Sequence, residues 1–340
     1  MAGRTVIGLD IGSASIRAVE AHRGKSGIRI THFGQLSLPD GAVVGGVISD
    51  ERAVIIALRQ LWSTAKLRSH TVVLGVTNRQ IVVREMSVTN VPDRELRQTL
   101  PFQVRHVLPL PVEQSLLDFY PLEVPGDAPT VRGLLIAAPK AAVLTAVRTV
   151  ERANLHVARV DLASFALIRA AARLDDQIEA IADVGAQSTT VVAHHDGQPL
   201  IVRTIPRGGA EITKSVADRL GVATEEAEMI KREVGLVGVD RPDAVAAVRQ
   251  AVGALISEIR SSFIYLTSGD QQRRVTRLAL SGGGALLPGL DRALHEELGA
   301  DVVVADPLAR LRGNGVVVAA DLEQHRSSAA VALGLTLGAS

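Results

Sequence analysis

Two short segments of the sequence place an aspartate at the end of an apolar run and small residues directly behind it. The aspartate is Asp10 in the first segment and Asp183 in the second, 173 positions later. A glycine in such a turn lets the backbone approach a ligand closely, and neighbouring N–H and hydroxyl groups can donate to a phosphate. An aspartate at a strand end can bind Mg²⁺ directly or through water. One segment alone is typical of an ordinary hairpin, but the pair predicts two hairpins that face one phosphate chain.

Each residue type in the two turns therefore has an expected role. Asp10 and Asp183 are the candidate metal ligands. The candidate phosphate-binding residues are the small and polar residues behind them, namely Gly12, Ser13, Ser15, Gly185, Ala186, Gln187 and Ser188. Together these residues predict a site for a phosphate chain with bound Mg²⁺.

A third motif is a run of three glycines behind the apolar residues 278–280. Gly282, Gly283 and Gly284 carry no side chains, so a flat or bulky ligand such as adenosine could lie close to the backbone there. A flexible loop is the alternative. The apolar residues and Pro288 that follow favour an ordered turn.

The elements that must position these motifs alternate between strand and helix patterns. Three β-rich runs open the chain at 5–9, 15–21 and 28–38, and three more follow at 178–183, 189–194 and 200–205. Helical spacing of apolar residues is found at 51–65, 210–220, 224–234 and 243–267. The strand–turn–strand pattern thus occurs twice, which predicts an internal duplication in an α/β protein.

Composition excludes several classes of protein. The 340 residues include 37 basic and 36 acidic side chains, and this balance argues against a polybasic nucleic-acid coat protein. Aromatic residues make up only 2%, too few for a stacking platform for single-stranded nucleic acid. The chain has no cysteine, and the apolar stretch 329–339 is shorter than the roughly 20 residues of a spanning helix. We expect a cytoplasmic protein with no membrane span of its own and no nucleic-acid partner.

The order of the two hairpins and the glycine-rich turn resembles the actin-like ATPase superfamily of actin, sugar kinases and DnaK-type chaperones. The resemblance implies a two-lobed α/β fold of duplicated ribonuclease-H-like domains that binds ATP and Mg²⁺. It implies that the hairpins hold the β- and γ-phosphates and that the glycine-rich turn lies under the adenosine. Gly208 and Gly209 resemble a glycine pair near the terminal phosphate, where helix N-terminal amides favour an anion.

A second part of the resemblance is the helical segment that contains Glu228, Lys231 and Arg232. In the superfamily a Glu and a Lys of such a helix contact the ribose and the base. Glu228 and Lys231 are three positions apart, so both side chains lie on one face of a helix. A solvated ion pair within the helix is the alternative interpretation.

Within the superfamily, the position of a β/α insert at 86–157 is similar to that in FtsA and in the type IV pilus assembly PilM family. The stretch 91–120, with VPDREL, VLPLPVE and LDFY, is similar to the PilM family, although its helix is more basic at Arg94, Arg97 and Arg105. The implied organisation is a first lobe (1–85), the insert (86–157), a connecting helix (158–175), a second lobe (176–325) and a C-terminal connecting helix (326–340).

Membership of the PilM family would imply a role and a partner. The chain would be an ATP-binding component of the inner-membrane pilus assembly complex, with at most slow ATP hydrolysis and with scope for self-association. It would bind the N-terminal cytoplasmic tail of PilN and be recruited through it to the inner face of the cytoplasmic membrane. We expect the insert to form one wall of a groove for that extended peptide.

Two other functions remain open from the sequence. An FtsA-like cell-division filament protein would carry a basic amphipathic helix at its end, whereas this chain ends at Ser340 without one. A small-molecule kinase would need a catalytic aspartate near the first connecting helix, and Asp161 is the candidate. Asp161 could otherwise orient the water that attacks the γ-phosphate, or cap its helix.

Overall fold

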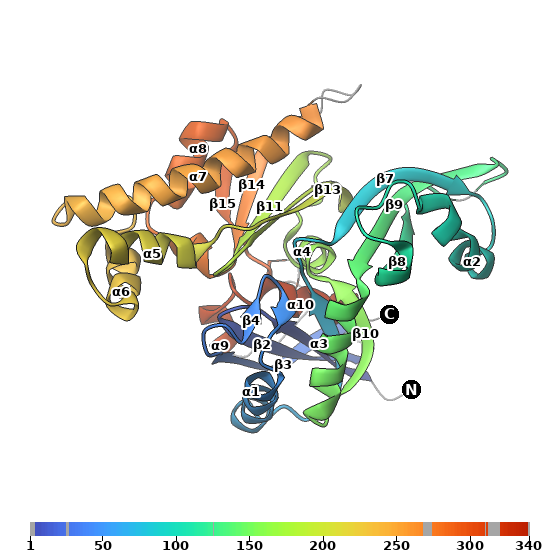
Figure 1. Ribbon diagram of the computed structural model, residues 1–340, viewed down its shortest axis with the longest axis horizontal. Helices are drawn as coiled ribbons and strands as arrows, with labels where there is room; N and C mark the ends of the chain where they lie inside the picture. Colours follow the sequence, from blue (N-terminus) through green and yellow to red (C-terminus); the bar gives the residue numbers. More distant parts are fainter. Residues whose placement is uncertain are drawn as a thin grey trace.

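Two five-stranded sheets lie on either side of a pair of short helices, and a three-stranded sheet projects to one side (Figure 1). The computed structural model describes residues 4–24, 27–124, 126–267, 274–309, 311 and 320–338. Within these residues, no helix combines the length and the apolar character that crossing a bilayer requires.

The first lobe is built on a sheet with the strand order β10-β6-β1-β2-β3. Its strands are β1 (Arg4–Ile11), β2 (Ser15–Gly24), β3 (Gly27–Ser37), β6 (Thr71–Val76) and β10 (His156–Leu162). A small hairpin of β4 (Val43–Val44) and β5 (Val47–Ile48) leads into α1 (Glu51–Thr64). The carboxylate of Asp50 accepts a hydrogen bond from the Ala53 amide and so caps the start of α1. Leu58 and Leu61 of α1 are fully buried against the sheet, as their helical spacing predicts.

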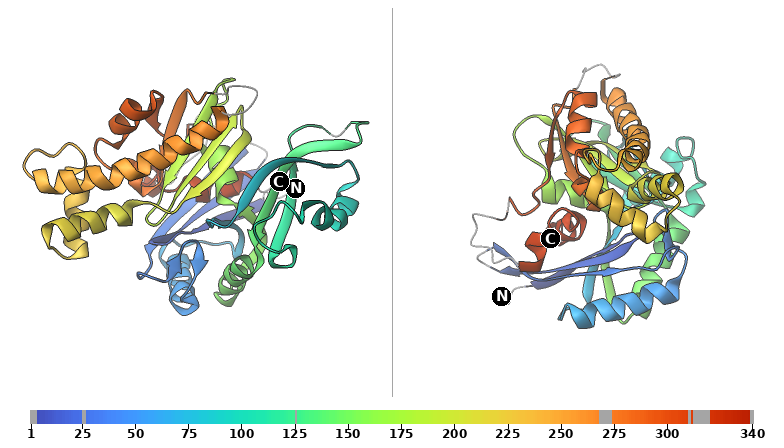
Figure 2. Two further views of the ribbon diagram at one scale, coloured as in Figure 1. Left: turned by 45° about the horizontal axis from the view of Figure 1, so that its top comes forward. Right: turned by 90° about the vertical axis from the view of Figure 1, so that its left-hand side faces the viewer.

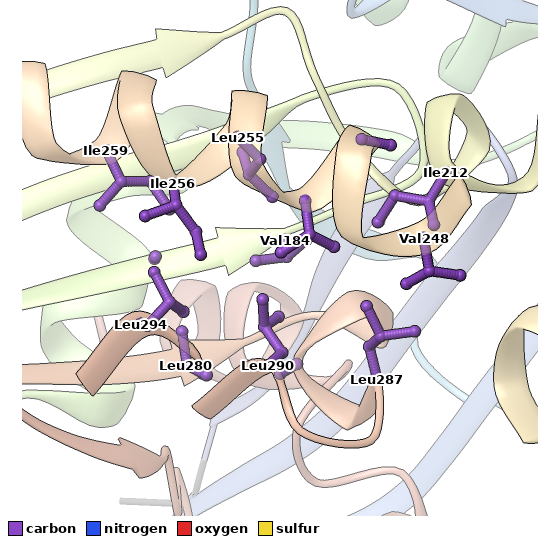
Figure 3. Close-up of a cluster of buried hydrophobic side chains, with 14 of the residues drawn as sticks. Val184, Ile212, Val248, Leu255, Ile256, Ile259, Leu280, Leu287, Leu290 and Leu294 are labelled. Atoms are coloured by element: carbon purple, nitrogen blue, oxygen red, sulfur yellow. The ribbon is translucent and has the colours of Figure 1, made fainter. Parts of the chain in front are cut away.

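The second lobe is built on a sheet with the strand order β13-β12-β11-β14-β15. Its strands are β11 (Ile178–Val184), β12 (Thr189–His195), β13 (Gln198–Ile205), β14 (Arg277–Ser281) and β15 (Asp301–Val304). Its helices are α5 (Gly209–Leu220), α6 (Thr224–Val234), α7 (Pro242–Thr267), the short 3-10 helix η2 (Gly283–Leu286) and α8 (Leu290–Leu298). Figure 3 shows the core of this lobe, where Leu255 and Ile259 of α7 point towards β11 and α8.

The two lobes repeat one topology, which confirms the predicted duplication. In each sheet the first three strands are antiparallel neighbours. In each sheet a fourth and a fifth strand then run parallel to the first strand on its other side. The two hairpins of the sequence motifs are therefore β1–β2 and β11–β12, at equivalent positions in the two lobes.

The lobes meet through two helices rich in small residues, α4 (Ala163–Ala171) and α10 (Ala330–Leu337). Figure 2 (right) shows α10 between the strands of the first lobe and the second lobe. Side chains of both sheets, such as Val6 of β1 and Ile181 of β11, pack in the same apolar cluster as these helices. The helices touch closely, because a Cβ on Gly334 would come within 1.9 Å of the Ala166 carbonyl oxygen. We call this cluster the hinge layer.

The insert has a sheet of its own with the order β7-β9-β8. It comprises β7 (Val82–Thr89), α2 (Asp93–Val104), the 3-10 helix η1 (Val112–Gln114), β8 (Ser115–Pro121) and β9 (Thr130–Pro139). A separate small core joins α2 to this sheet, with Leu100 and Val104 of the helix packed against Val131 and Leu135 of β9. The insert therefore has its own hydrophobic core.

The insert boundaries differ from those expected from the sequence. Its sheet covers residues 82–139, whereas the sequence suggested 86–157. Helix α3 (Lys140–Arg152) and β10 belong to the first lobe, because Val150 and Leu155 pack in its core and β10 pairs with β6. Local β/α patterns cannot show which sheet a strand joins.

The end of the second lobe also differs from the expected boundary at 325. Leu308, Leu311 and Leu322 pack against β2 and β3 of the first lobe, where they cover apolar side chains such as Phe33. Leu322 belongs to the short helix α9 (Ala320–Gln324). The chain therefore crosses back to the first lobe before α10 begins.

Replacing Gly334 with Ala should destabilise the protein, because the added Cβ would collide with the α4 backbone. We expect a loss of about 1–3 kcal/mol in the free energy of unfolding, typical of overpacking, measured as a lower urea midpoint. The control is Gly253→Ala in α7, where no atom lies within 4 Å of the new Cβ. This change should stabilise the helix by about 0.5–1 kcal/mol. Equal midpoints for Gly334→Ala and the wild type would contradict the close packing.

Candidate nucleotide site at the lobe junction

The two turns that the sequence identified have the same backbone geometry. The Gly12 amide donates to the Ser15 carbonyl over 3.0 Å, and the Gly185 amide donates to the Ser188 carbonyl over the same distance. Each turn closes its hairpin directly behind the aspartate. The resemblance between the two sequence motifs therefore extends to their hydrogen bonds.

Asp10 and Asp183 lie close enough to influence each other across the lobe junction. Burial, and after it the negative charge of Asp10, raises the pKa of Asp183 to about 6, against the lowering effects of Arg17 and Ser281. Burial also raises the pKa of Asp10, although Arg17 opposes this. The Arg17 guanidinium lies 3.3 Å from Asp10 Oδ2. Two carboxylates that repel each other form a site where a cation is favourable.

The chemistry of these side chains fits Mg²⁺ bound together with phosphate. Carboxylate oxygens are preferred Mg²⁺ ligands, and such sites commonly use one or two carboxylates with water and substrate phosphates. Within the described residues, no group of three or more His, Cys, Asp or Glu side chains could hold a metal ion. An ion held by Asp10 and Asp183 alone would need further oxygen ligands, which water or phosphate can supply.

The second turn packs against the start of α5. The amides of Gly209 and Ala210 donate to the carbonyls of Gly185 and Ala186, over 2.9 and 2.8 Å. A Cβ on Gly208 would lie 2.4 Å from the Gly185 oxygen, so this contact requires a glycine there. The sequence suggested that these helix amides favour an anion, and in this conformation two of them bind the turn instead.

Glu228, Lys231 and Arg232 form one network on α6. Lys231 Nζ lies 2.5 Å from Glu228 Oε2 and also donates to the Gly209 carbonyl and the Thr213 hydroxyl. Arg232 binds the other oxygen of Glu228 over 2.7 Å. Lys231 is only 8% exposed, and its burial lowers its pKa, so the Lys231–Glu228 pair is not the solvated pair considered as an alternative. This network joins α6 to the beginning of α5.

The glycine-rich turn lies against β11 of the second hairpin. Gly282 has a φ of +83°, and a Cβ there would come within 2.5 Å of the Val184 oxygen. Gly284 likewise leaves room for the Val184 side chain, whereas Gly283 faces open space. The turn is ordered, as Pro288 suggested, and Ser281 and Ser327 hold it through hydrogen bonds to backbone carbonyls.

Asp161 lies at the end of β10, in register with Gly75 and, one strand further, with Asp10. Its carboxylate accepts hydrogen bonds from Arg169 Nη2 over 2.5 Å and from the Leu162 amide over 2.8 Å. Helix α4 begins after Leu162, and no side chain caps it, so Asp161 is not the cap considered from the sequence. The ion pair with Arg169 holds the carboxylate against the connecting helix.

The structure adds residues that the sequence motifs did not identify. Arg17 lies directly opposite Asp10 in the β1–β2 pairing. The length of the turn between the two strands would have indicated this position from the sequence. Ser281 faces Asp183 in the β11–β14 pairing, which no local pattern indicates. A separate cavity of about 460 Å³ lies between α7 and α8 and is lined by none of the predicted site residues.

Comparison with known proteins places the chain in a family. The family model described as type IV pilus assembly protein PilM matches residues 8–340. The chain belongs to the PilM family. A solved PilM-PilN type IV pilus biogenesis complex contains a chain 25% identical to it, with a TM-score of 0.84 over 98% of this chain and 97% of that one.

Other similar proteins confirm the actin-like fold. Cell division protein FtsA of Bacillus subtilis (strain 168) is 25% identical over 346 residues, covering 88% of this chain and 78% of FtsA. The structure of Spiroplasma citri MreB5 bound to ADP is 14% identical, with a TM-score of 0.56 over 98% of this chain and 95% of MreB5. This PilM-family chain thus has the predicted two-lobed actin-like fold.

Replacing Asp183 with Asn should stabilise the nucleotide-free protein at pH 7.5, because it removes a carboxylate whose charge is disfavoured by burial and, after it, by the charge of Asp10. A carboxyl whose folded-state pKa is raised favours folding at low pH, and this contribution is lost as the pH rises from about 4 to about 6. The two pKa units correspond to about 3 kcal/mol at neutral pH. Thermal unfolding across pH 4–8 would measure the difference.

Asp240→Asn is the matched control, since Asp240 is exposed in the loop between α6 and α7. The wild type and this control should show the same pH dependence, whereas Asp183→Asn should lose stability less steeply as the pH rises. A variant that unfolds at the same temperature as the wild type at both ends of this range would show that the pKa of Asp183 is not raised in the folded protein.

Proposed function

We propose that this PilM-family chain binds Mg²⁺-ATP at the lobe junction and acts in type IV pilus assembly by binding the N-terminal tail of a PilN protein. The observation that carries the nucleotide site is the pair of equivalent turns that brings Asp10 and Asp183 together. Asp10 and Asp183 would hold Mg²⁺, and the turn residues Gly12, Ser13, Ser15, Gly185, Ala186 and Ser188 would surround the phosphates. The ADP in the MreB5 structure, which has the same fold, supports this proposal.

The second half of the site would receive the nucleoside. Gly283 faces open space beside Gly282 and Gly284, and α6 brings Glu228, Lys231 and Arg232 to the start of α5. Arg169 pairs with Asp161, so a role for Asp161 as a free base would require this pair to separate. This pairing supports slow hydrolysis at most, in agreement with an ATP-binding assembly component rather than a small-molecule kinase.

The insert would receive the peptide. Strand β8 is an edge of the insert sheet, and a peptide can add to such an edge through main-chain hydrogen bonds. Leu116 and Tyr120 on β8 are exposed, and the Tyr120 ring lies 5.6 Å from that of Phe165 on α4. The exposed face of β8 thus carries Leu116, Asp118 and Tyr120, and at Tyr120 it lies beside α4 of the hinge layer. Recruitment by a membrane-anchored PilN would place this cytoplasmic protein at the inner face of the membrane.

The nucleotide proposal predicts Mg²⁺-dependent binding of a fluorescent ATP analogue. Asp183→Asn should weaken binding in the presence of Mg²⁺ by about tenfold or more, because a charged metal ligand is lost, while EDTA should abolish the difference between the two proteins. Asp240→Asn should bind like the wild type. Wild-type affinity of Asp183→Asn with magnesium dependence retained would show that Asp183 is not a metal ligand.

The partner proposal predicts that Tyr120→Ser weakens binding of a PilN N-terminal peptide by about tenfold or more, as expected for a central aromatic contact. Phe102→Ser is the control, because Phe102 is an aromatic residue of the same insert that is 70% exposed on α2. Calorimetry with the peptide would measure both affinities. Equal affinities for the two variants would place the peptide elsewhere, and competition by ATP would place it at the lobe junction.

A further inference from the structure

The side chain of Gln187 links the two lobes beyond the paired aspartates. Its Oε1 atom accepts a hydrogen bond from the Gly45 amide over 3.2 Å, although the residues are 142 positions apart. Gln187 lies in the β11–β12 turn, and Gly45 lies between β4 and β5 of the first lobe. In Figure 1 the β4–β5 hairpin extends from the first lobe towards the second. This contact uses a residue that the sequence suggested for phosphate binding.

The first-lobe partner is held firmly in place. Val43 and Ile48 of the hairpin are buried in the lobe core. Gly46 fits so tightly that a Cβ would lie 1.9 Å from the carbonyl oxygen of Thr77, behind β6. The Gly45 amide therefore has a fixed position relative to the first-lobe sheet.

The second-lobe side is fixed as well. The turn that carries Gln187 is closed by the bond from Gly185 to Ser188, and it binds the start of α5 through the carbonyls of Gly185 and Ala186. The equivalent residue in the first-lobe turn is Ala14, which has no polar side chain. The hydrogen bond from Gly45 to the Gln187 side chain is therefore a feature of the second-lobe turn alone. It is not part of the backbone geometry that the two turns share.

The Gln187–Gly45 contact lies on the same hairpin as Asp183. Along β11, Ile181 lies in the hinge layer, Asp183 follows two residues later on the same face, and Gln187 lies in the turn beyond. A second polar contact joins the lobes nearby, where the hydroxyls of Thr77 and Thr190 are 3.5 Å apart. Along the chain, Asp183 therefore lies between a residue of the apolar hinge layer and the turn that makes the Gln187–Gly45 contact.

We infer that Gln187 is a positioning residue that latches the lobes over the site, and that this latch sets the rate of nucleotide exchange. The inference rests on the proposed nucleotide function, and it changes the expected role of Gln187 from a phosphate ligand to an interlobe contact. The Gln187–Gly45 bond holds the two lobes together beside the candidate site, so nucleotide would enter or leave after this bond breaks. One neutral hydrogen bond corresponds to about a two- to tenfold change in the population of the open state.

The two roles of Gln187 differ in their kinetics. If Gln187 latches the lobes of both the empty and the loaded protein, Gln187→Ala should raise the association and the dissociation rates of a fluorescent ATP analogue together, by about two- to tenfold, and leave Kd nearly unchanged. If Gln187 binds phosphate, the variant should raise only the dissociation rate and weaken Kd. The control is Gln250→Ala on the exposed surface of α7, which should exchange at the wild-type rate. Unchanged rates, or a rise in dissociation alone, would overturn the latch.

A covalent lock tests the same inference without removing Gln187. The chain has no cysteine, so Thr77→Cys with Thr190→Cys introduces a single thiol pair across the junction. The oxidised double variant should neither load nor release nucleotide at a measurable rate, and reduction should restore exchange. Exchange by the oxidised protein at the reduced rate would overturn the inference.

Disulfide formation also separates the latch from the nucleotide function. The disulfide should form in the absence of nucleotide, and Gln187→Ala should slow its formation because the lobes are held together less of the time. If both results hold and wild-type protein binds no nucleotide, the proposed function fails while the latch stands. If no disulfide forms in the nucleotide-free protein, the lobes are not latched and the inference fails, whatever the protein binds.

Discussion

The close packing of α4 and α10 between the two sheets is the constraint on which the site depends. Gly334 allows α10 to touch the α4 backbone. Gly8 allows β1 to pack equally closely against α10, because a Cβ on Gly8 would lie 2.0 Å from the Ala332 carbonyl oxygen. Larger residues at either position would move the sheets apart. Because Asp10 follows Gly8 by two residues on one strand, and Asp183 follows Ile181 by two on another, the same contact brings both carboxylates to the junction. The hinge layer thus determines the electrostatics of the site.

Those electrostatics are unfavourable without a cation. Burial raises the pKa of both aspartates, the charge of Asp10 adds to this effect at Asp183, and Arg17 compensates only in part. The two charged carboxylates therefore lower the stability of the folded protein at this position, and such strongly perturbed groups are typical of binding sites. Around this position the backbone is fixed by contacts that need glycine, at Gly208 against the second turn and at Gly282 against β11. A site with rigid walls and unbalanced charge is suited to a ligand that brings its own cation.

The insert is organised separately from this site. Its core around Leu100 and Leu135 is distinct from the cores of the two lobes, and its strands pair only with one another. Tyr120 of β8 nevertheless touches Phe165 of α4, and α4 belongs to the hinge layer. A peptide on the insert edge would therefore lie beside an element that both lobes contact, which gives a physical route between partner binding and the arrangement of the lobes.

The sequence by itself determined the features that depend on neighbouring residues: the two aspartate turns, the helices with one apolar face and the repeated order of strands. Even Arg17 follows from the sequence once the length of the β1–β2 turn is known, because the antiparallel pairing then places it opposite Asp10. Tertiary structure decided which sheet β10 joins, which lobe Leu322 covers, and that Lys231 is buried in a network with Gly209 and Thr213. It also directed Gln187 to Gly45, 142 positions away. Residue type and short spacing fix local conformation, but a contact between distant segments depends on how whole sheets pack, and that is a property of the complete core.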